Sequence, residues 1–126
     1  MICIPITARS AEDTISEMVS ASKYADIVEL RIDYIPDLQN ALTCIEKSLK
    51  NKTKPVIITN RPEREGGNFK GNEQDRLGLL QKAIELGADY VDVEYDSIKQ
   101  ITRRDSSKII ISHHNFKETP HNLNKI

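Results

Sequence analysis

The sequence predicts an α/β protein of the (β/α)8 TIM-barrel type, of which this chain supplies about the first half. Short runs rich in Ile and Val recur along the chain, and amphipathic patterns of helical period fill most of the gaps between them. Charged residues stand within these runs, close to their C-terminal ends. The chain has 126 residues, whereas a complete barrel of this type needs about 250.

The first strand–helix unit is predicted from a strand at residues 2–7. Ser10 and Asp13 then fit a capping box, because the Ser10 side chain can accept a backbone N–H that the start of a helix leaves unpaired. The inward positions of this helix are expected at Ile15, Met18, Val19 and Ser22. A second unit joins a strand at residues 26–32 to a helix whose apolar face comprises Leu38, Ala41, Leu42, Ile45 and Leu49.

The third unit begins with a strand at residues 54–60 and a long loop. Asn72 can cap the helix that follows, and Gly87 stands where a left-handed residue ends such a helix. The inward residues of this helix are expected at Leu77, Leu80 and Ile84.

The remaining elements are a strand at residues 90–94, a short and weak helical pattern at residues 96–104, and a strand at residues 108–113. The five strand runs are nearly continuous in apolar residues, which is typical of parallel sheets covered by helices. No linker or low-complexity tract divides the chain. We therefore expect one partial barrel domain over residues 1–126.

Parallel strands with helical crossovers leave two architectures open, a doubly wound sheet and a barrel. Alternation places Glu29 and Arg31 on the same face of one strand, and Asp92 and Glu94 on the same face of another. A doubly wound sheet has helices on both faces, so charges inside its strands would be hard to bury. The interior end of a barrel accepts charges that pair or meet a ligand, and the barrel is therefore favoured.

Composition points to a small-molecule partner. The chain holds 18 basic and 19 acidic residues, which give a net charge of −1 with no basic stripe for nucleic acid. It has no membrane-length apolar segment and no secretion signal, so we expect a cytoplasmic protein without a membrane partner. Cys3 and Cys44 are isolated, which argues against a disulfide framework or a zinc site.

Polar residues at the C-terminal ends of the strands are the candidate functional residues, since that edge carries the sites of parallel β/α folds. Glu29 and Arg31 could instead form a plain ion pair that ends a strand. Asp92, Glu94, His113 and His114 could supply ligands for a divalent ion, although interior ion pairs are the simpler explanation for the two carboxylates. Histidine is also the side chain best suited to moving protons near neutral pH.

The loop at residues 61–73 is dense in charge and glycine. Such a loop can act as a lid or ligand clamp, because glycine permits hinge motion and close backbone approach. A phosphate cradle is a weaker interpretation, since the glycines fit no phosphate-binding pattern and Glu73 and Asp75 would repel an anion. A solvated turn with a tight Gly-Gly bend remains a third interpretation.

Four segments together resemble one enzyme family. They are ELRIDY at residues 29–34, TNRPEREGGNFKGNE at 59–73, LGADYVDVEYD at 86–96 and ISHHNFKETP at 111–120. In order and spacing they resemble the type I 3-dehydroquinate dehydratases of the shikimate pathway, which are (β/α)8 barrels. The resemblance covers essentially the whole chain and the front half of the family's barrel.

The resemblance implies an imine mechanism. A lysine of the family forms an imine with the ketone of 3-dehydroquinate, a proton is removed beside it, and a hydroxyl leaves as water to give 3-dehydroshikimate. No metal or organic cofactor is implied. His114 matches the general acid/base, Glu65 the carboxylate that orients it, and Glu29, Arg31 and Arg61 the groups that bind the substrate. His113 occupies the variable position before His114.

The family's imine-forming lysine lies beyond residue 126, and Lys117 and Lys125 do not stand in its sequence context. We therefore predict that this chain alone has no appreciable dehydratase activity. The first and fifth strands would be open edges, so we also expect a homo-oligomer or association with a missing half. A noncatalytic half-barrel that binds the substrate is the alternative in another functional class.

Overall fold

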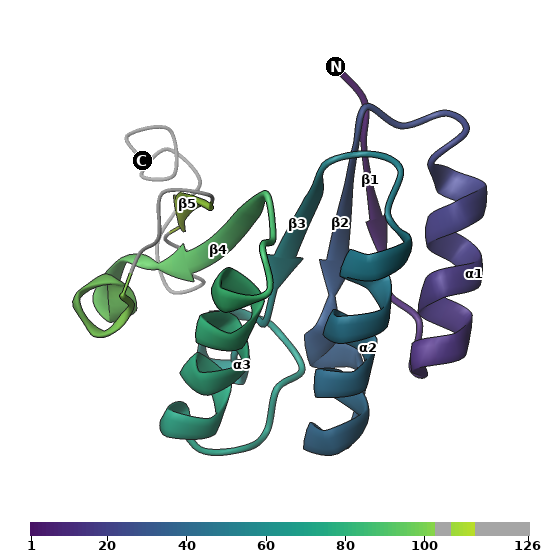
Figure 1. Ribbon diagram of the computed structural model, residues 1–126. Helices are drawn as coiled ribbons and strands as arrows, with labels where there is room; N and C mark the ends of the chain where they lie inside the picture. Colours follow the sequence, from purple (N-terminus) through teal and green to yellow (C-terminus); the bar gives the residue numbers. More distant parts are fainter. Residues whose placement is uncertain (103–106, 113–126) are drawn as a thin grey trace.

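Five parallel strands form one sheet, in which they lie side by side in the order of the chain (Figure 1). The computed structural model describes residues 1–102 and 107–112. Each strand pairs in parallel with the next. The strands are β1 (Cys3–Ile6), β2 (Ile27–Arg31), β3 (Val56–Thr59), β4 (Tyr90–Glu94) and β5 (Lys108–Ser112).

Three helices cover one face of this sheet in Figure 1: α1 (Ala11–Ala21), α2 (Leu38–Asn51) and α3 (Glu73–Glu85). A doubly wound sheet reverses its strand order and has helices on both faces. The sequential order with a single helical layer is instead the arrangement of a barrel, so the predicted partial (β/α)8 fold is confirmed. None of the described helices has the length and apolar character needed to cross a membrane.

Three short 3-10 helices follow the C-terminal ends of strands or lie in the loops after them: η1 (Ile32–Tyr34), η2 (Glu63–Glu65) and η3 (Tyr95–Gln100). The predicted helix at residues 96–104 was wrong in type and extent, because η3 takes its place and ends at Gln100. Residues 103–106 lie outside the described part of the chain.

The predicted helix ends are confirmed by their local hydrogen bonds. The Ser10 hydroxyl accepts the Asp13 N–H at 3.1 Å, and the Asn72 side chain accepts the Asp75 N–H at 2.7 Å. Gly87 ends α3 with a φ of 90°, a conformation that residues with a side chain rarely adopt. Asp37 caps α2 in the same manner.

The buried face of α1 includes the predicted Met18 and Ser22 but differs from the prediction at Val19. Thr14, Met18 and Ser22 are buried and form a single row along the helix, each four residues from the next. Val19, expected to point inward, is 53% exposed because it lies about 100° around the helix from Met18. Periodicity places apolar residues on one side of a helix, but packing against the sheet decides which row is buried.

The hydrophobic core lies between the sheet and its helices. The core-facing residues of the strands are fully buried, and they include Val28, Leu30, Val56, Ile58, Val91 and Val93. The alternate residues point to the opposite face, which the helices do not cover. Cross-strand register aligns Arg31 with Thr59, and Thr59 with Asp92. One face of the sheet is therefore apolar, and the other becomes polar near the C-terminal ends of the strands.

Candidate active site

The predicted site residues that the structure describes gather beside the C-terminal ends of β2, β3 and β4. Glu29 and Arg31 belong to β2, Arg61 follows β3 by two residues, and Glu65 ends η2. His113 and His114 lie outside the described residues, so their predicted roles stay predictions. Alternation along β2 places Glu29 and Arg31 on the polar face, as expected.

Glu29 and Arg31 do not pair with each other as the simpler interpretation proposed. The Thr59 hydroxyl donates to Glu29 at 2.7 Å. Arg31 forms a two-point contact with Asp33, in which its Nε and Nη2 lie 3.0 and 2.9 Å from the two carboxylate oxygens. The Arg31 guanidinium also lies 5.2 Å from the centre of the Tyr34 ring.

Arg61 is held by the end of β4. Its Nη1 donates to Asp92 at 3.0 Å and to Glu94 at 2.7 Å, and its Nη2 donates to the other Asp92 oxygen at 3.2 Å. Ser112 of β5 lies 2.8 Å from Nη1. Burial lowers the pKa of Arg61, but its contacts with Asp92 and Glu94 outweigh burial and raise the pKa. The guanidinium is therefore a fixed positive charge on the polar face.

Arg76 extends this cluster to the helical side of the sheet. It is 1% exposed, pairs with Glu94, and donates to the Asn60 carbonyl at 3.0 Å. Its Nη2 lies 2.7 Å from Glu73 at the start of α3. Alternating charges thus connect Glu73 through Arg76 and Glu94 to Arg61. Each buried charge has a counter-charge, which is the condition for keeping ions out of water.

The sequence reasoning missed Arg76, Asp33 and Thr59. A signal for Arg76 was available, because it precedes the buried Leu80 by four residues and so falls on the inward row of α3. A signal for Asp33 was its place two residues after Arg31 in the ELRIDY segment. Neither pattern identifies the side chains that Arg76 and Asp33 contact, since those contacts depend on strand register and on packing between the helices and the sheet.

The two carboxylates that a metal site would require already bind arginines, which argues against the metal-site alternative. Both oxygens of Asp92 accept hydrogen bonds from Arg61, and the two oxygens of Glu94 are shared between Arg61 and Arg76. A divalent ion would have to displace these arginines. No cluster of three or more potential metal ligands occurs within residues 1–102 and 107–112.

The loop between β3 and α3 folds back on the end of β3. The Phe69 N–H donates to the Arg61 carbonyl at 3.1 Å, and the Gly67 N–H donates to the Pro62 carbonyl at 2.9 Å. Gly66 adopts a φ of 83°, and a Cβ added to Gly67 would overlap the Arg61 carbonyl. The tight Gly-Gly bend is therefore present, with Glu65 directly before it.

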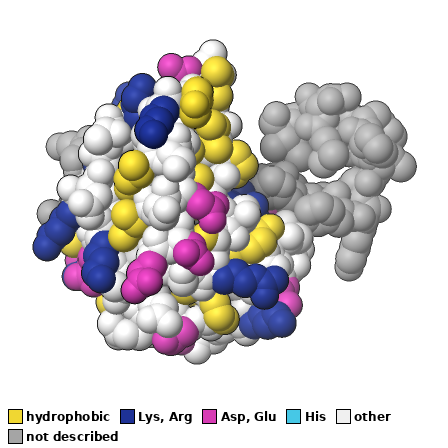
Figure 2. Space-filling view, turned by 90° about the vertical axis from the view of Figure 1, so that its right-hand side faces the viewer, with side chains coloured by type: hydrophobic (Ala, Val, Ile, Leu, Met, Phe, Trp, Pro, Cys, Tyr) yellow, Lys and Arg dark blue, Asp and Glu magenta, His cyan; other side chains and the backbone are white. Residues whose placement is uncertain are grey.

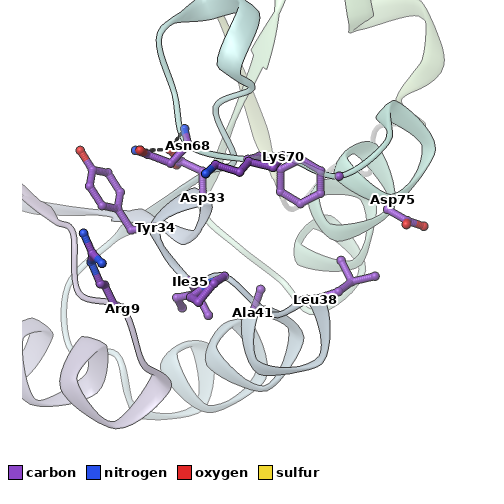
Figure 3. Close-up of a pocket in the computed structure, with 12 residues that line it drawn as sticks. Arg9, Asp33, Tyr34, Ile35, Leu38, Ala41, Asn68, Lys70 and Asp75 are labelled. Carbon is purple, nitrogen blue, oxygen red and sulfur yellow. Dashed lines mark hydrogen bonds between the residues drawn. The ribbon is translucent and has the colours of Figure 1, made fainter.

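A pocket of about 320 Å³ lies beneath this loop, between Asn68–Lys70 above and the start of α2 below (Figure 3). Its floor is apolar and includes Ile35, Leu38 and Ala41. Glu29, Arg31 and Arg61 are not among its lining residues. The pocket is therefore adjacent to the predicted site and separate from it.

Comparison with known proteins gives one consistent family. The model of the type I 3-dehydroquinase family matches residues 2–126. A 3-dehydroquinate dehydratase of Methanocaldococcus jannaschii is 42% identical over 127 aligned residues, which cover 95% of this chain and 56% of that protein. A chloroplastic bifunctional 3-dehydroquinate dehydratase/shikimate dehydrogenase of Arabidopsis thaliana is 38% identical, with 95% of this chain and 21% of that protein covered.

A crystal structure of type I 3-dehydroquinate dehydratase from Clostridium difficile, determined with covalently modified comenic acid, is similar with a TM-score of 0.80 and 25% identity. The match covers 94% of this chain and 52% of that chain. The chain thus spans about half the length of the single-function relatives that it matches. With the family model matched over nearly every residue, the chain belongs to the type I 3-dehydroquinase family.

Proposed function

We propose that the protein takes part in the dehydration of 3-dehydroquinate to 3-dehydroshikimate. The observation that carries this proposal is the family match over residues 2–126. The polar cluster at the ends of β2, β3 and β4 supports it, because the family resemblance assigns substrate binding to Glu29, Arg31 and Arg61. These three side chains lie at the edge of the sheet where parallel β/α folds bind ligands.

The local chemistry suits a polyhydroxylated substrate. Glu29 accepts one hydrogen bond from Thr59, and the carboxylate has further acceptor capacity for a substrate hydroxyl. Arg31 and Arg61 are each held by carboxylates, Arg31 by Asp33 and Arg61 by Asp92 and Glu94. Because their guanidinium planes are fixed, their remaining N–H groups can bind substrate oxygens without first becoming ordered.

His114 is proposed to move the proton and Glu65 to orient it, both by resemblance to the family. An imine formed at the substrate ketone would act as an electron sink, so that a histidine of ordinary basicity could remove the neighbouring proton. The same histidine would then donate the proton to a hydroxyl group of the substrate, which leaves as water. The imine-forming lysine is expected outside residues 1–126.

Two matched histidine variants test the proposal. Each substitution is made in a polypeptide of the same length as the one that the native source produces. His114→Ala is expected to lower kcat by at least about 100-fold, whereas His113→Ala is expected to retain kcat. Formation of 3-dehydroshikimate is followed by absorbance, with and without a chelator. Equal losses in both variants, or loss of activity on chelation, would favour the metal-site alternative. Saturable dehydroquinate binding without turnover in the unmodified protein would identify a noncatalytic binding module.

A further inference from the structure

Asp33 is a buried carboxylate that holds two parts of the proposed site at once. It lies in η1, two residues beyond Arg31, and its side chain is 0% exposed. Its two oxygens accept hydrogen bonds from Arg31 and from Asn68. The donors of Arg31 and Asn68 take the place of the water that a carboxylate so enclosed does not reach.

The contact with Arg31 fixes the plane of a guanidinium. Two parallel N–H···O bonds of 3.0 and 2.9 Å leave the Arg31 side chain little rotational freedom about the carboxylate. The Tyr34 ring packs against the same guanidinium at 5.2 Å. The direction in which Arg31 presents its remaining N–H groups is therefore set by Asp33.

The contact with Asn68 fixes the loop between β3 and α3. The Asn68 backbone N–H and side-chain amide lie 3.1 and 3.4 Å from one Asp33 oxygen, and Figure 3 shows Asn68 directed toward Asp33. The two hydrogen bonds from Asn68 join this loop to the β2–α2 segment, and both end on Asp33.

The pocket beneath the loop limits the other contacts that hold it on this side. Between Asn68–Lys70 and the start of α2 there is a space of about 320 Å³, and Phe69 is the residue of this stretch that packs against the hydrophobic core. The other loop contacts lead elsewhere: Phe69 bonds to Arg61, and Arg64 pairs with Glu73 and Asp96. Asp33 is thus the polar tie on the side of the loop that faces β2.

We propose that Asp33 is a positioning residue that couples Arg31 to the loop carrying Glu65, so that the substrate-binding group and the histidine-orienting group are set together. The functional part of this inference rests on the proposed dehydratase function, whereas the coupling itself rests on geometry alone. Glu65 is three residues from Asn68, and the Gly66-Gly67 bend between them is closed by hydrogen bonds to the Glu63 and Pro62 carbonyls of the same loop. Because Glu65 and Asn68 flank this one closed bend, a displacement of Asn68 moves the backbone that carries Glu65.

The first test is independent of activity. Asp33→Asn keeps the side-chain shape but removes the negative charge and places an NH2 group against a donor of Arg31 or of Asn68, so the charge-assisted contact that they share is weakened. We expect the Asn68 amide to exchange with solvent about tenfold faster, while amides of β2 and β3 retain their protection. Asp37→Asn is the matched control, because asparagine also caps helices and the Asp37 side chain accepts its hydrogen bond from Gln39 of α2. Unchanged exchange at Asn68 in Asp33→Asn would overturn the proposal.

A measurement on the unmodified protein keeps the test decisive if Asp33→Asn does not fold. The Asn68 amide should exchange at least about tenfold more slowly than the Lys70 amide, which donates to none of the described residues. Similar exchange rates at these two exposed loop positions would show that Asp33 does not hold the loop.

The second test uses steady-state kinetics with 3-dehydroquinate. Asp33→Asn is expected to raise KM about tenfold, through Arg31, and to lower kcat, through Glu65. In an Arg31→Met background, Asp33→Asn should still lower kcat; no further change there would reduce Asp33 to a support for Arg31 alone and overturn the coupling. If the unmodified protein does not turn over dehydroquinate, the proposed function fails, and the exchange result still decides whether Asp33 ties the loop.

Discussion

At the scale of single residues, the buried charges of this protein are arranged as a connected series. Glu94 and Arg76 have almost no exposed surface, and each contacts opposite charge on two sides. Removing one member of a buried ion pair leaves its partner uncompensated, which is far more costly than losing a surface pair. The series reaches water at Glu73, which also pairs with the partly exposed Arg64. Glu73 is therefore the member at which pH can act.

Glu73→Gln is expected to reduce stability at neutral pH by about 1 kcal/mol, a value discounted because the Glu73 side chain is 40% exposed. The hydrogen bond from Arg76 lowers the pKa of Glu73 from 4.5 to about 2. A carboxylate with a lowered pKa stabilises the fold above its unfolded pKa and loses that contribution as pH falls. Urea unfolding should thus show a stability loss between pH 4.5 and about 2 that is reduced in the variant.

Asp75→Asn is the control for this comparison. Asp75 also lies in the first turn of α3, so its neutralisation removes the same favourable interaction with the helix dipole. It forms no ion pair with the described residues, and its variant should retain the acid sensitivity of the unmodified protein. Equal effects of the two substitutions would assign the stability of this region to the helix dipole and contradict a specific role for the Glu73–Arg76 pair.

Residue-level prediction from the sequence succeeded where the chemistry was local. Alternation placed Glu29 with Arg31 and Asp92 with Glu94 on common faces, and register in the sheet confirms both. It did not identify that Arg61 bridges Asp92 and Glu94, because residues about 30 positions apart meet only through strand pairing. His114 and Glu65 were assigned through family resemblance, and their roles stay predictions.

At the scale of elements, the loop between β3 and α3 depends on close backbone contact. Gly67 packs so near the Arg61 carbonyl that even one methyl group has no space. At Gly78, within α3, the position that a Cβ would occupy is open apart from the neighbouring backbone of its own helix. The same substitution should therefore have opposite effects at the two positions.

Gly67→Ala is expected to destabilise the protein by about 2 kcal/mol, since the bend must move away from Arg61 to relieve the overlap. Gly78→Ala is expected to stabilise it by about 1 kcal/mol, because alanine restricts the unfolded chain and favours the helix. Chemical denaturation of both variants under one set of conditions measures the difference. Stabilisation by alanine at position 67 would show that the bend at Gly66-Gly67 is not held against Arg61.

Helix ends were easier to predict than helix faces for a physical reason. Ser10, Asn72 and Gly87 end their helices through backbone groups only a few residues away, so a short stretch of sequence is enough to recognise them. Whether Val19 or Thr14 of α1 is buried depends on how the whole helix is rotated against the sheet. That rotation is settled by packing with β1, β2 and α2, which periodicity within α1 does not contain.

At the scale of the whole molecule, β1 and β5 are the outer strands of the described sheet. Each has one hydrogen-bonded neighbour there, and apolar side chains remain exposed beside them: Ile2 is 55% and Ile111 is 57% exposed. In the view of Figure 2, which faces α1, hydrophobic side chains gather along one margin of the described part. Unpaired strand edges with apolar side chains favour pairing with another chain.

The polypeptide of residues 1–126 is accordingly expected to self-associate, and Ile111→Lys is expected to shift it toward the monomer, because a charge on an edge strand opposes edge pairing. Sedimentation velocity over a range of concentrations measures this shift. Tyr24→Lys provides the control: Tyr24 is 75% exposed but lies in the connection between α1 and β2, away from β5. A similar shift in both variants would indicate nonspecific hydrophobic contact.

The sequential strand order also bears on how the protein is made. In the described sheet, each strand from β2 to β5 pairs with the strand that precedes it in the chain, and successive helices pack against each other. Each new strand–helix unit can therefore pack against a unit that has already been synthesised. Contacts between near neighbours in sequence carry a small entropic penalty for loop closure. The sheet can therefore grow from β1 onward while the ribosome is still translating the later strands, and the Arg61 cluster is completed only when β5 emerges to supply Ser112.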